Sequence, residues 1–511
     1  MKRMQIKRYL FIMILFFALT VNYAYNLLDV GNTAFSLFQA DSETLVTGMI
    51  IADRQGIDTL KYGLSRYCDN AGWLFSLDDR GGVFLTDESW SEGYSKWEPK
   101  ILLSNNIYTQ TYAVPGNYVR FGNGEVVLIT AAWGDGQYYV VQLDKDQPLD
   151  SVQYGSLHDM ALLDQIGETC PPGAVLPYCS QFGLQGKVFR RLARYLDCGV
   201  EETVAVLQLF CAMSAAAVFV LIVLLIQKKY NDLMSACFYI TFLLSPWIVN
   251  FARNLYWVEF TWFIPVLIGL ACSIYVADRR DRVICYISAF IAITVKCLCG
   301  YEYITAIMLG MCSFLLVDFA TYCFIRRDRV RAKLLFRTLF IMGCCALIGF
   351  AVAVCIHAYY RSGGDIPQGI QDIMRLDAAR RMQGVGDESG GASQNILTWH
   401  VCGFYFRFST EIITGIPGNL FPVLCIVPIC IFACNYQKKI INWNDVVMYI
   451  VFMLTSISWF VLAKGHSYIH LHMNYVLWYF GYVQMCIYVI VKQALFKDSK
   501  SNALQMIKCK K

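Results

Sequence analysis

The sequence predicts an α-helical protein that crosses a membrane about ten times and carries a β-rich domain in its first outer loop. The 511-residue chain is 57% hydrophobic and only 16% charged, whereas ordinary soluble domains contain about 25% charged residues. Uncharged apolar stretches of about 20 residues, long enough to span roughly 30 Å of hydrocarbon, recur from Val204 to the C-terminus. These observations exclude a single soluble globular domain.

Apolar windows predict ten membrane-spanning helices. In chain order they cover residues 9–25, 204–226, 233–250, 256–276, 283–299, 303–324, 335–357, 418–435, 446–463 and 474–495. The first has a basic start and a short apolar core, as a signal peptide would. Because Tyr23 and Tyr25 flank Ala24, no small-x-small cleavage site follows, and we expect a retained signal anchor.

The basic residues predict the orientation of these helices. One set of loops with the adjoining helix ends, together with both chain ends, contains 23 of the 43 Lys and Arg, whereas the short opposite loops with their adjoining helix ends contain only Arg253, Lys296 and Lys464. The positive-inside rule therefore predicts a multi-pass protein of the cell membrane with both termini in the cytoplasm. A net charge of +5 is too small to indicate a nucleic-acid partner.

The predicted spans divide the chain into six parts. These are a signal-anchor helix (1–26), an extracytoplasmic domain (27–202), helices two to seven (203–358), an extracytoplasmic loop (359–408), helices eight to ten (409–496) and a basic cytoplasmic tail (497–511).

Two of these parts lie outside the membrane and have recognisable patterns. The first contains the β-like runs Tyr118 to Thr130 and Gln137 to Leu143, with turn signals at Gly122-Asn123-Gly124 and Gly134-Asp135-Gly136. The second contains a helical patch of mixed charge at Asp372 to Arg381. A mobile lid and a passive surface loop both fit the second part.

Most of the 21 cysteines lie in predicted spans, where they serve as small apolar residues. Only four lie in the first outer domain: Cys68, Cys170, Cys179 and Cys198. A disulfide between Cys170 and Cys179 and four free thiols are both consistent with this pattern. No pair of cysteines has zinc-site spacing.

Charged and histidine side chains gather at the predicted outer ends of the helices. Besides Asp41 and Glu43, which follow the first span, the group comprises Arg253, Glu259, Lys296, Glu302, Arg361, Arg407, Lys464, His466, His470 and His472. Charge at the edge of the hydrocarbon is costly, so this placement indicates a functional site. Carboxylates that remove a proton, beside cations that hold an anion, suit transfer from a phosphorylated lipid.

Several of these residues also have structural interpretations. Lys296 and Glu302 could neutralise each other across a tight turn, and Arg253 could be an interface anchor. The Lys464 to His472 segment holds three of the six histidines; it could bind phosphate, coordinate a divalent metal or form an uncommitted loop. No cofactor is certain. Asp41 could also be the N-cap of a helix over Thr44 to Arg54.

At these residues the chain resembles the GT-C superfamily of integral-membrane glycosyltransferases, which use polyprenyl-phosphate sugars. That superfamily has an acidic motif just after its first span, where Phe38-Gln39-Ala40-Asp41-Ser42-Glu43 stands in this chain. The stretches Gly48 to Gly56 and Tyr178 to Gly186 resemble the two halves of that first outer loop, with residues 68–175 as a β-rich insertion. Further similar motifs are Ser245-Pro246-Trp247, Asn254-Leu255-Tyr256-Trp257, Gly300-Tyr301-Glu302-Tyr303 and Lys464 to His472.

The resemblance implies a function and a catalytic base. The expected reaction moves a sugar from a polyprenyl-phosphate donor to a glycan, lipid or protein acceptor of the cell envelope. Asp41, or else Glu43, would be the base, since Asp-Ser-Glu replaces the commoner adjacent acids. A surface-polysaccharide polymerase or ligase, a transporter or flippase, and a sensor or assembly factor are the alternatives.

Overall fold

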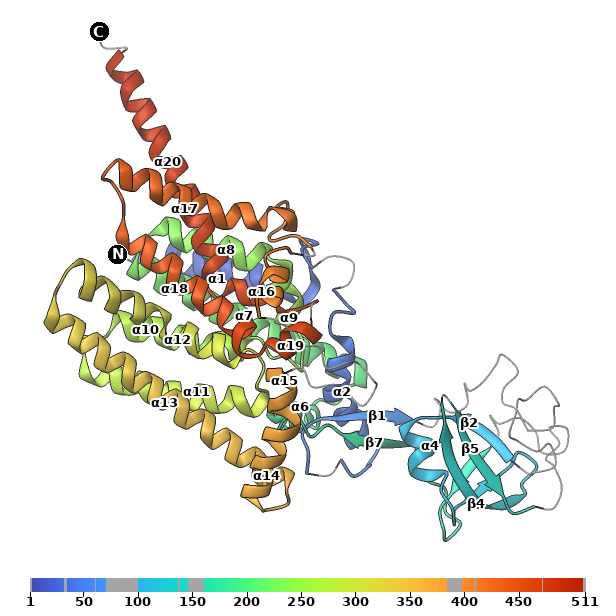
Figure 1. The fold of residues 1–511 in the computed structure, drawn as a ribbon. Coiled ribbons are helices and arrows are strands. Elements are labelled where there is room, and N and C mark those ends of the chain that lie inside the picture. Colours follow the sequence, from blue (N-terminus) through green and yellow to red (C-terminus); the bar gives the residue numbers. More distant parts are fainter. Residues whose placement is uncertain are drawn as a thin grey trace. The chain divides into compact units, whose positions relative to one another are not determined.

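The computed structural model describes residues 2–31, 35–59, 61–69, 100–136, 138–145, 160–383, 398–408, 410–470 and 472–508 (Figure 1). The chain forms two compact units, each described here by itself. The helical unit comprises Met1–Ala40, Ser180–Gln185 and Glu201–Lys511, and the β-containing unit comprises Asp41–Cys179 and Gly186–Val200. The short segment Ser180–Gln185 therefore belongs to the helical unit although it lies within the first expected outer domain.

Long helices make up most of the helical unit. They are α1 (Lys2–Tyr25), α7 (Val200–Lys229), α8 (Asp232–Leu244), α9 (Pro246–Ala252), α10 (Phe260–Ile274), α11 (Arg279–Cys299), α12 (Ile304–Ala320), α13 (Arg329–Arg361), α17 (Phe421–Gln437), α18 (Trp443–Leu462) and α20 (Tyr482–Lys508). Shorter elements join them: η2 (Thr321–Ile325), α14 (Ile366–Asp372), η3 (Ile373–Ala378), α15 (Ala379–Gln383), α16 (Thr398–Tyr405), η4 (Gly418–Leu420), α19 (Lys464–Ile469) and η5 (Asn474–Tyr479).

Among the described residues, seven helices are long and apolar enough to cross a membrane, or up to eight if the bent pair α8 and α9 forms one span. The pair bends by 64° where Pro246 begins α9, because proline interrupts the helical hydrogen-bond ladder. Two further expected spans correspond to shorter apolar helices, α10 and the Tyr482–Leu495 part of α20. The mainly helical class with several candidate spans is confirmed and fits a multi-pass protein, and the count of about ten remains a prediction.

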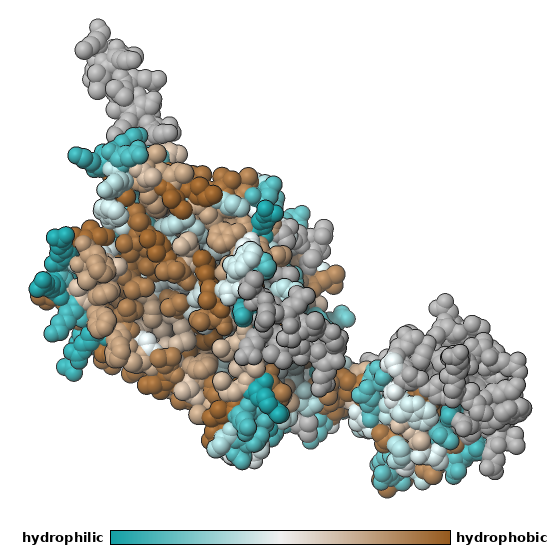
Figure 2. Space-filling view, in the orientation of Figure 1, coloured by the Kyte–Doolittle hydropathy of each residue, from teal (hydrophilic) through white to brown (hydrophobic). Residues whose placement is uncertain are grey.

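The two ends of the helical unit differ in charge. The basic loops α10–α11, α12–α13 and α17–α18 lie at the same end as the two chain termini, whereas α9, α16 and α19 lie at the opposite end (Figure 1). Figure 2 shows hydrophobic side chains along the flank between these ends and hydrophilic side chains gathered at the basic end. Asp278 and Asp328 cap the N-termini of α11 and α13 at that end. The spatial grouping agrees with the positive-inside pattern.

The β-containing unit includes α2 (Ala40–Arg54), α4 (Ile107–Tyr112) and α6 (Leu184–Ala193). An antiparallel pair joins β1 (Ser65–Asp69) to β7 (Gly173–Pro177), with Cys68 opposite Ala174. A five-stranded sheet has the order β2-β5-β4-β3-β6, with β2 (Lys100–Ser104), β3 (Tyr118–Arg120), β4 (Val126–Asp135), β5 (Tyr138–Leu143) and β6 (Ala161–Leu163). Alternate side chains of these strands, such as Ile101, Val119, Ile129 and Val141, form its buried core.

The β-like runs were correctly predicted, with two differences of detail. Gly122-Asn123-Gly124 separates β3 from β4 as expected, but Gly134 and Asp135 continue β4, so that turn comes later than predicted. α2 begins at Ala40, which places Asp41 inside the first turn instead of at the N-cap. Within the described part of the chain, Cys68, Cys170, Cys179 and Cys198 form no disulfide.

Close packing of α10 against α12 depends on Gly269. A Cβ atom at this position would lie 1.7 Å from the backbone oxygen of Met311, and a backbone atom cannot move aside alone. We expect Gly269→Val to lower the free energy of unfolding by at least about 1–3 kcal/mol, measured by unfolding of the purified protein in detergent. Gly343→Val in α13 is the matched control, since no atom lies within 4 Å of its Cβ position. An equal loss in both variants would contradict the packing argument.

Candidate functional site

The turn between α11 and α12 buries a lysine and a glutamate at the end of the helical unit opposite the basic loops. Lys296 lies in the last turn of α11, is 2% exposed, and donates from Nζ to the Gly300 carbonyl at 2.6 Å. Glu302 follows in the turn and is 5% exposed. A Cβ atom at Gly300 would lie 2.4 Å from Glu302 Oε2, so only glycine lets this carboxylate fold back over the turn.

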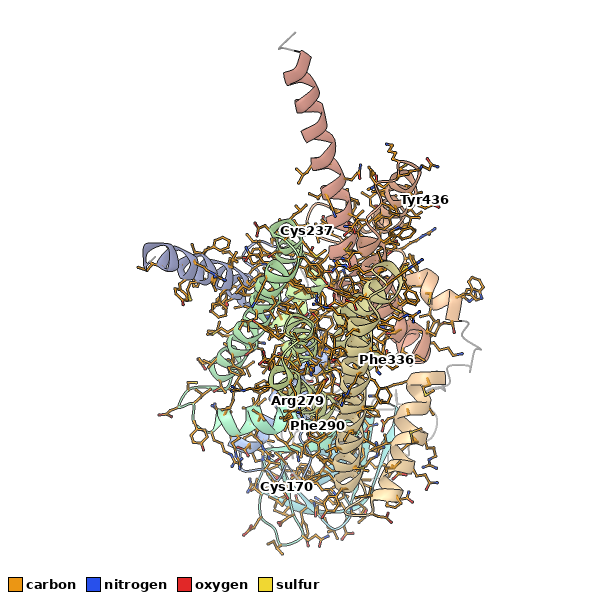
Figure 3. The ribbon with its side chains drawn as sticks, turned by 90° about the vertical axis from the view of Figure 1, so that its left-hand side faces the viewer. Cys170, Cys237, Arg279, Phe290, Phe336 and Tyr436 are labelled. Carbon is orange, nitrogen blue, oxygen red and sulfur yellow. The ribbon has the colours of Figure 1, made fainter. Side chains whose placement is uncertain are left out.

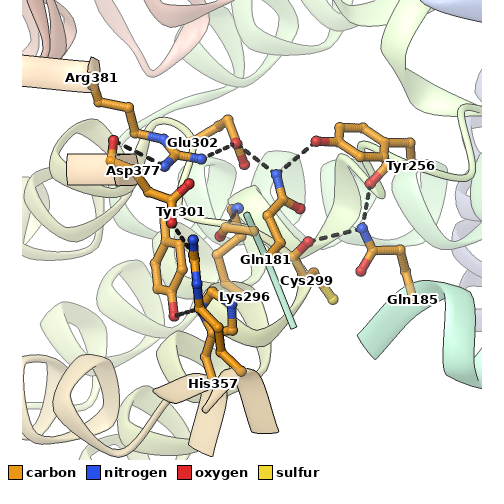
Figure 4. A network of polar contacts seen from close by, with 12 residues as sticks. Gln181, Gln185, Tyr256, Lys296, Cys299, Tyr301, Glu302, His357, Asp377 and Arg381 are labelled. Carbon is orange, nitrogen blue, oxygen red and sulfur yellow. Dashed lines mark hydrogen bonds and ion pairs between the residues drawn. The ribbon is translucent and has the colours of Figure 1, made fainter. Parts of the chain in front are cut away.

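Side chains from two segments that are distant in the sequence donate hydrogen bonds to the Glu302 carboxylate (Figure 4). Gln181 Nε2 donates to Oε1 at 2.8 Å, and Arg381 Nη2 in α15 donates to the same oxygen at 3.1 Å. Gln181 Nε2 also donates to the Tyr256 hydroxyl at 2.6 Å. Gln185 Nε2 donates to the Tyr256 carbonyl at 3.0 Å, which ties the 180–185 segment to the start of the α10 region.

A second buried carboxylate continues the network. Asp377 is 3% exposed and accepts from Arg361 Nη1 at the end of α13. Arg381 Nη1 donates to the Asp377 carbonyl at 3.3 Å. We call Gln181, Tyr256, Lys296, Gly300, Glu302, Arg361, Asp377 and Arg381 the Glu302 network. Beside it the Tyr301 hydroxyl and His357 Nδ1 are 3.1 Å apart.

Positive charge predominates in the Glu302 network. Its three cationic side chains, Lys296, Arg361 and Arg381, outnumber its two carboxylates, so the formal charges sum to +1. Burial acts to raise the pKa of the Glu302 carboxyl, but the charges of Arg381 and Lys296 outweigh it and lower that pKa to about 2. Glu302 is therefore a carboxylate at neutral pH, held by cations and available to organise an anion site.

The histidine segment packs beside this network through aromatic contacts. The His466 ring in α19 is 7% exposed and lies 6.3 Å from Tyr303 and 4.5 Å from His470, centroid to centroid. The Tyr303 hydroxyl donates to Asn474 Oδ1 at 2.8 Å, so the turn after Glu302 is fixed to the segment after the histidines. His472 is exposed, and its Nε2 lies 2.8 Å from Gln39 Nε2.

An apolar cavity of about 220 Å³ borders the Glu302 network. Side chains from α12, α13, η3 and α18 line it, among them Ile304, Val354, Ile373 and Trp459. Arg381 and Asp377 belong to both the cavity wall and the network. At this place in the fold, charged side chains therefore border a cavity whose wall is mainly apolar.

The structure does not bring all of the predicted residues to this network. The Arg253 guanidinium lies over the Phe35 ring at 4.2 Å, and Arg407 is exposed. Lys464 is half-buried at the start of α19. Glu259 is fully buried, and among the described residues neither of its carboxyl oxygens has a hydrogen-bond partner.

The two candidate bases lie on a different part of the chain. Asp41 and Glu43 are in the first turn of α2, in the β-containing unit. Asp41 is exposed and lies 3.5 Å from Arg66, measured from Oδ2 to Nη2. Within the described part of the chain, no group of three or more His, Cys, Asp or Glu side chains is arranged to hold a metal ion.

Sequence reasoning missed Gln181, Gln185, Asp377 and Arg381 as site residues. The two glutamines lie four residues apart within the Tyr178 to Gly186 motif, and the Asp–Arg pair has the same spacing within the mixed-charge patch. Asp377 and Arg381 lie in the consecutive helical segments η3 and α15, where this spacing places both on one face, whereas Gln181 precedes α6 and only Gln185 is helical. Only their burial distinguishes them from an ordinary surface pair.

No family model, no curated protein and no solved structure matches this chain. Its function is therefore argued from its own residues.

Removing the charge of Glu302 would leave Arg381 and Lys296 buried without their carboxylate. We expect Glu302→Gln to lower the free energy of unfolding by about 3–5 kcal/mol, measured by unfolding of the purified protein in detergent. The double variant Glu302→Gln with Arg381→Met should recover part of the loss, because it removes one of the stranded cations. Glu411→Gln at an exposed position is the control, with an expected change within about 0.5 kcal/mol. A change of that small size in Glu302→Gln would contradict the buried-charge argument.

Proposed function

We propose that the protein is a membrane glycosyltransferase that moves a sugar from a polyprenyl-phosphate donor to a cell-envelope acceptor on the outer face of the membrane. One observation carries the proposal: the cation-rich Glu302 network borders the apolar cavity, and Arg381 belongs to both. A polyprenyl phosphate combines the two matching properties, since an anionic phosphate is joined to a hydrocarbon chain.

The phosphate would bind to the positive side of the site. Arg381 supplies a planar guanidinium fork, which suits phosphate oxygens, and Lys296 and Arg361 contribute positive charge nearby. The network has a formal charge of +1 in a buried place, where an anion is stabilised more strongly than in water. The carboxylates hold the cations in position while the site is empty.

The hydrocarbon chain would occupy the cavity beside α12, α13 and α18. Its lining is almost entirely apolar, so it offers an isoprenoid chain the same hydrophobic surroundings as the bilayer. Because Arg381 lies at the edge of the cavity, it would hold the phosphate just outside the cavity and the first isoprenoid unit just inside it.

The transfer step is the one that the GT-C resemblance implies. An acceptor hydroxyl oxygen would bond to the anomeric carbon, and the bond from that carbon to the phosphate oxygen would break. The electron pair of the broken bond would go to the lipid phosphate, whose growing negative charge the cations stabilise. Asp41, or else Glu43, would accept the hydroxyl proton. This assignment of the base rests on the resemblance.

The strongest rival is a transporter or flippase for the same kind of lipid. The 64° break between α8 and α9 favours it, because transporters often form their binding sites at discontinuous helices. A polysaccharide polymerase or ligase would use donors of the same chemical class and would need the same cations. A direct assay of sugar transfer with defined acceptors separates these possibilities.

Replacing the proposed base should stop the reaction without disturbing membrane insertion. We expect Asp41→Asn to reduce turnover of polyprenyl-phosphate sugars by at least about 100-fold, the usual contribution of a general base. The measurement is sugar transfer by purified protein in liposomes, with nucleotide sugars as the inactive donor class.

Asp58→Asn is the matched control for that variant, because Asp58 is another exposed acid of the same unit. Near-normal turnover in Asp41→Asn would remove Asp41 from the role and direct attention to Glu43. No turnover of any lipid-linked sugar by the wild type would support a transporter or flippase instead.

Filling the cavity should weaken donor binding. Ala378 in η3 lines it, and we expect Ala378→Phe to raise the KM for the lipid-linked donor by at least about tenfold, since the added ring competes with the hydrocarbon chain. Leu376→Phe on the same segment is the control, because Leu376 is 48% exposed and lies outside the cavity lining. An unchanged KM in Ala378→Phe with retained folding would show that the chain binds elsewhere.

A further inference from the structure

The π-helix η2, at the basic end of the helical unit, arranges two arginines around one tyrosine. The guanidinium carbons of Arg326 and Arg331 lie 4.8 Å and 4.7 Å from the centroid of the Tyr322 ring. Arg326 Nη1 also donates to the Tyr322 hydroxyl at 2.9 Å. Because both carbons lie within 5 Å of one centroid, they are at most 9.5 Å apart.

This pair of cations has little compensating negative charge. Among the described residues, neither Arg326 nor Arg331 takes part in an ion pair within 4 Å. Two acids lie in this region: Asp328 caps α13 by accepting from the backbone N–H of Arg331, and Asp318 pairs with Lys229 at 2.6 Å and also interacts electrostatically with Arg326 and Arg331. Lys229, Arg326 and Arg331 thus share the single charge of Asp318, so a further anion near both guanidiniums would be stabilised.

Exposed apolar residues lie close to the arginine pair in the chain. Phe324 is 71% exposed and Val330 is 84% exposed, on either side of Arg326 in the chain. Phe336 and Phe340 continue the apolar surface along α13, with exposed fractions of 55% and 63%; Figure 3 labels Phe336 on this helix. Cations next to exposed hydrocarbon-facing side chains are typical of the headgroup level of a bilayer.

We propose that Tyr322, Arg326 and Arg331 bind the phosphodiester headgroup of an anionic phospholipid. Two guanidiniums present several N–H donors to phosphate oxygens, and the shared ring holds them at a spacing that one headgroup can reach. The acyl chains of the same lipid lie along the phenylalanines of α13. An anionic lipid such as phosphatidylglycerol is preferred over phosphatidylcholine, because the choline of the latter brings its own positive charge to the arginines.

The site differs from a diffuse basic surface in one testable respect, which is its dependence on the tyrosine ring. Arg279 and Arg280, at the start of α11, are exposed basic residues. Figure 3 labels Arg279. Among the described cation–ring contacts none involves either of them. They provide a matched pair of positive charges without the shared ring.

The test is native mass spectrometry of the full-length protein in mild detergent with equal amounts of phosphatidylglycerol and phosphatidylcholine. We expect the wild type to retain phosphatidylglycerol selectively. The double variant Arg326→Gln with Arg331→Gln should lose roughly one retained molecule, and Tyr322→Leu should lose it too although both charges remain. The double variant Arg279→Gln with Arg280→Gln should retain it.

Three outcomes would overturn the proposal. The first is equal loss in the two double arginine variants, which would indicate diffuse electrostatic attraction. The second is full retention by a folded Tyr322→Leu protein, as judged by circular dichroism and gel filtration. The third is a loss of lipid selectivity, seen either as an absence of preference for phosphatidylglycerol or as displacement of phosphatidylglycerol by millimolar inorganic phosphate. Displacement would identify a site for free phosphate.

Discussion

The burial of the Glu302 carboxylate is the interaction on which this end of the helical unit depends. Removing a carboxylate from water costs several kcal/mol unless cations and donors replace the water. No single segment supplies them: Gln181 comes from the first outer stretch, and Arg381 comes from a short helix 79 residues beyond Glu302. One buried charge therefore draws together chain segments that share no secondary structure.

The same turn also organises the aromatic residues at this end. Tyr303 has a left-handed backbone conformation (φ 62°) and is fully buried. Its ring lies within about 6 Å of Trp257, Trp262 and Trp459, so the residue after Glu302 is fixed from three directions. This packing connects the charged network to the histidine segment, whose His466 contacts Tyr303.

Much of the fold and part of the site could be predicted from the sequence. Hydropathy located the helices, and glycine-rich turns located the strands, because these signals are local. The sequence grouped Lys296, Glu302 and His466 because residues at helix ends share one depth, and in the structure Lys296 and His466 lie within electrostatic range of Glu302. The same argument also grouped Arg253 and Arg407, which lie away from the Glu302 network. The depth of a residue along the helices does not specify its position across the bundle. Arg381 was missed because a polar loop residue has no local sign of burial.

By itself, the sequence determined the helical class, the basic end and the level at which polar residues gather, because apolar length and charge are properties of short windows. The tertiary structure alone decided which of those residues meet. Close approach at Gly269 to the Met311 carbonyl brings α10 against α12, and such contacts set the lateral order of the helices. The pairing of Glu302 with Arg381 follows from that order, which no periodicity in the chain encodes.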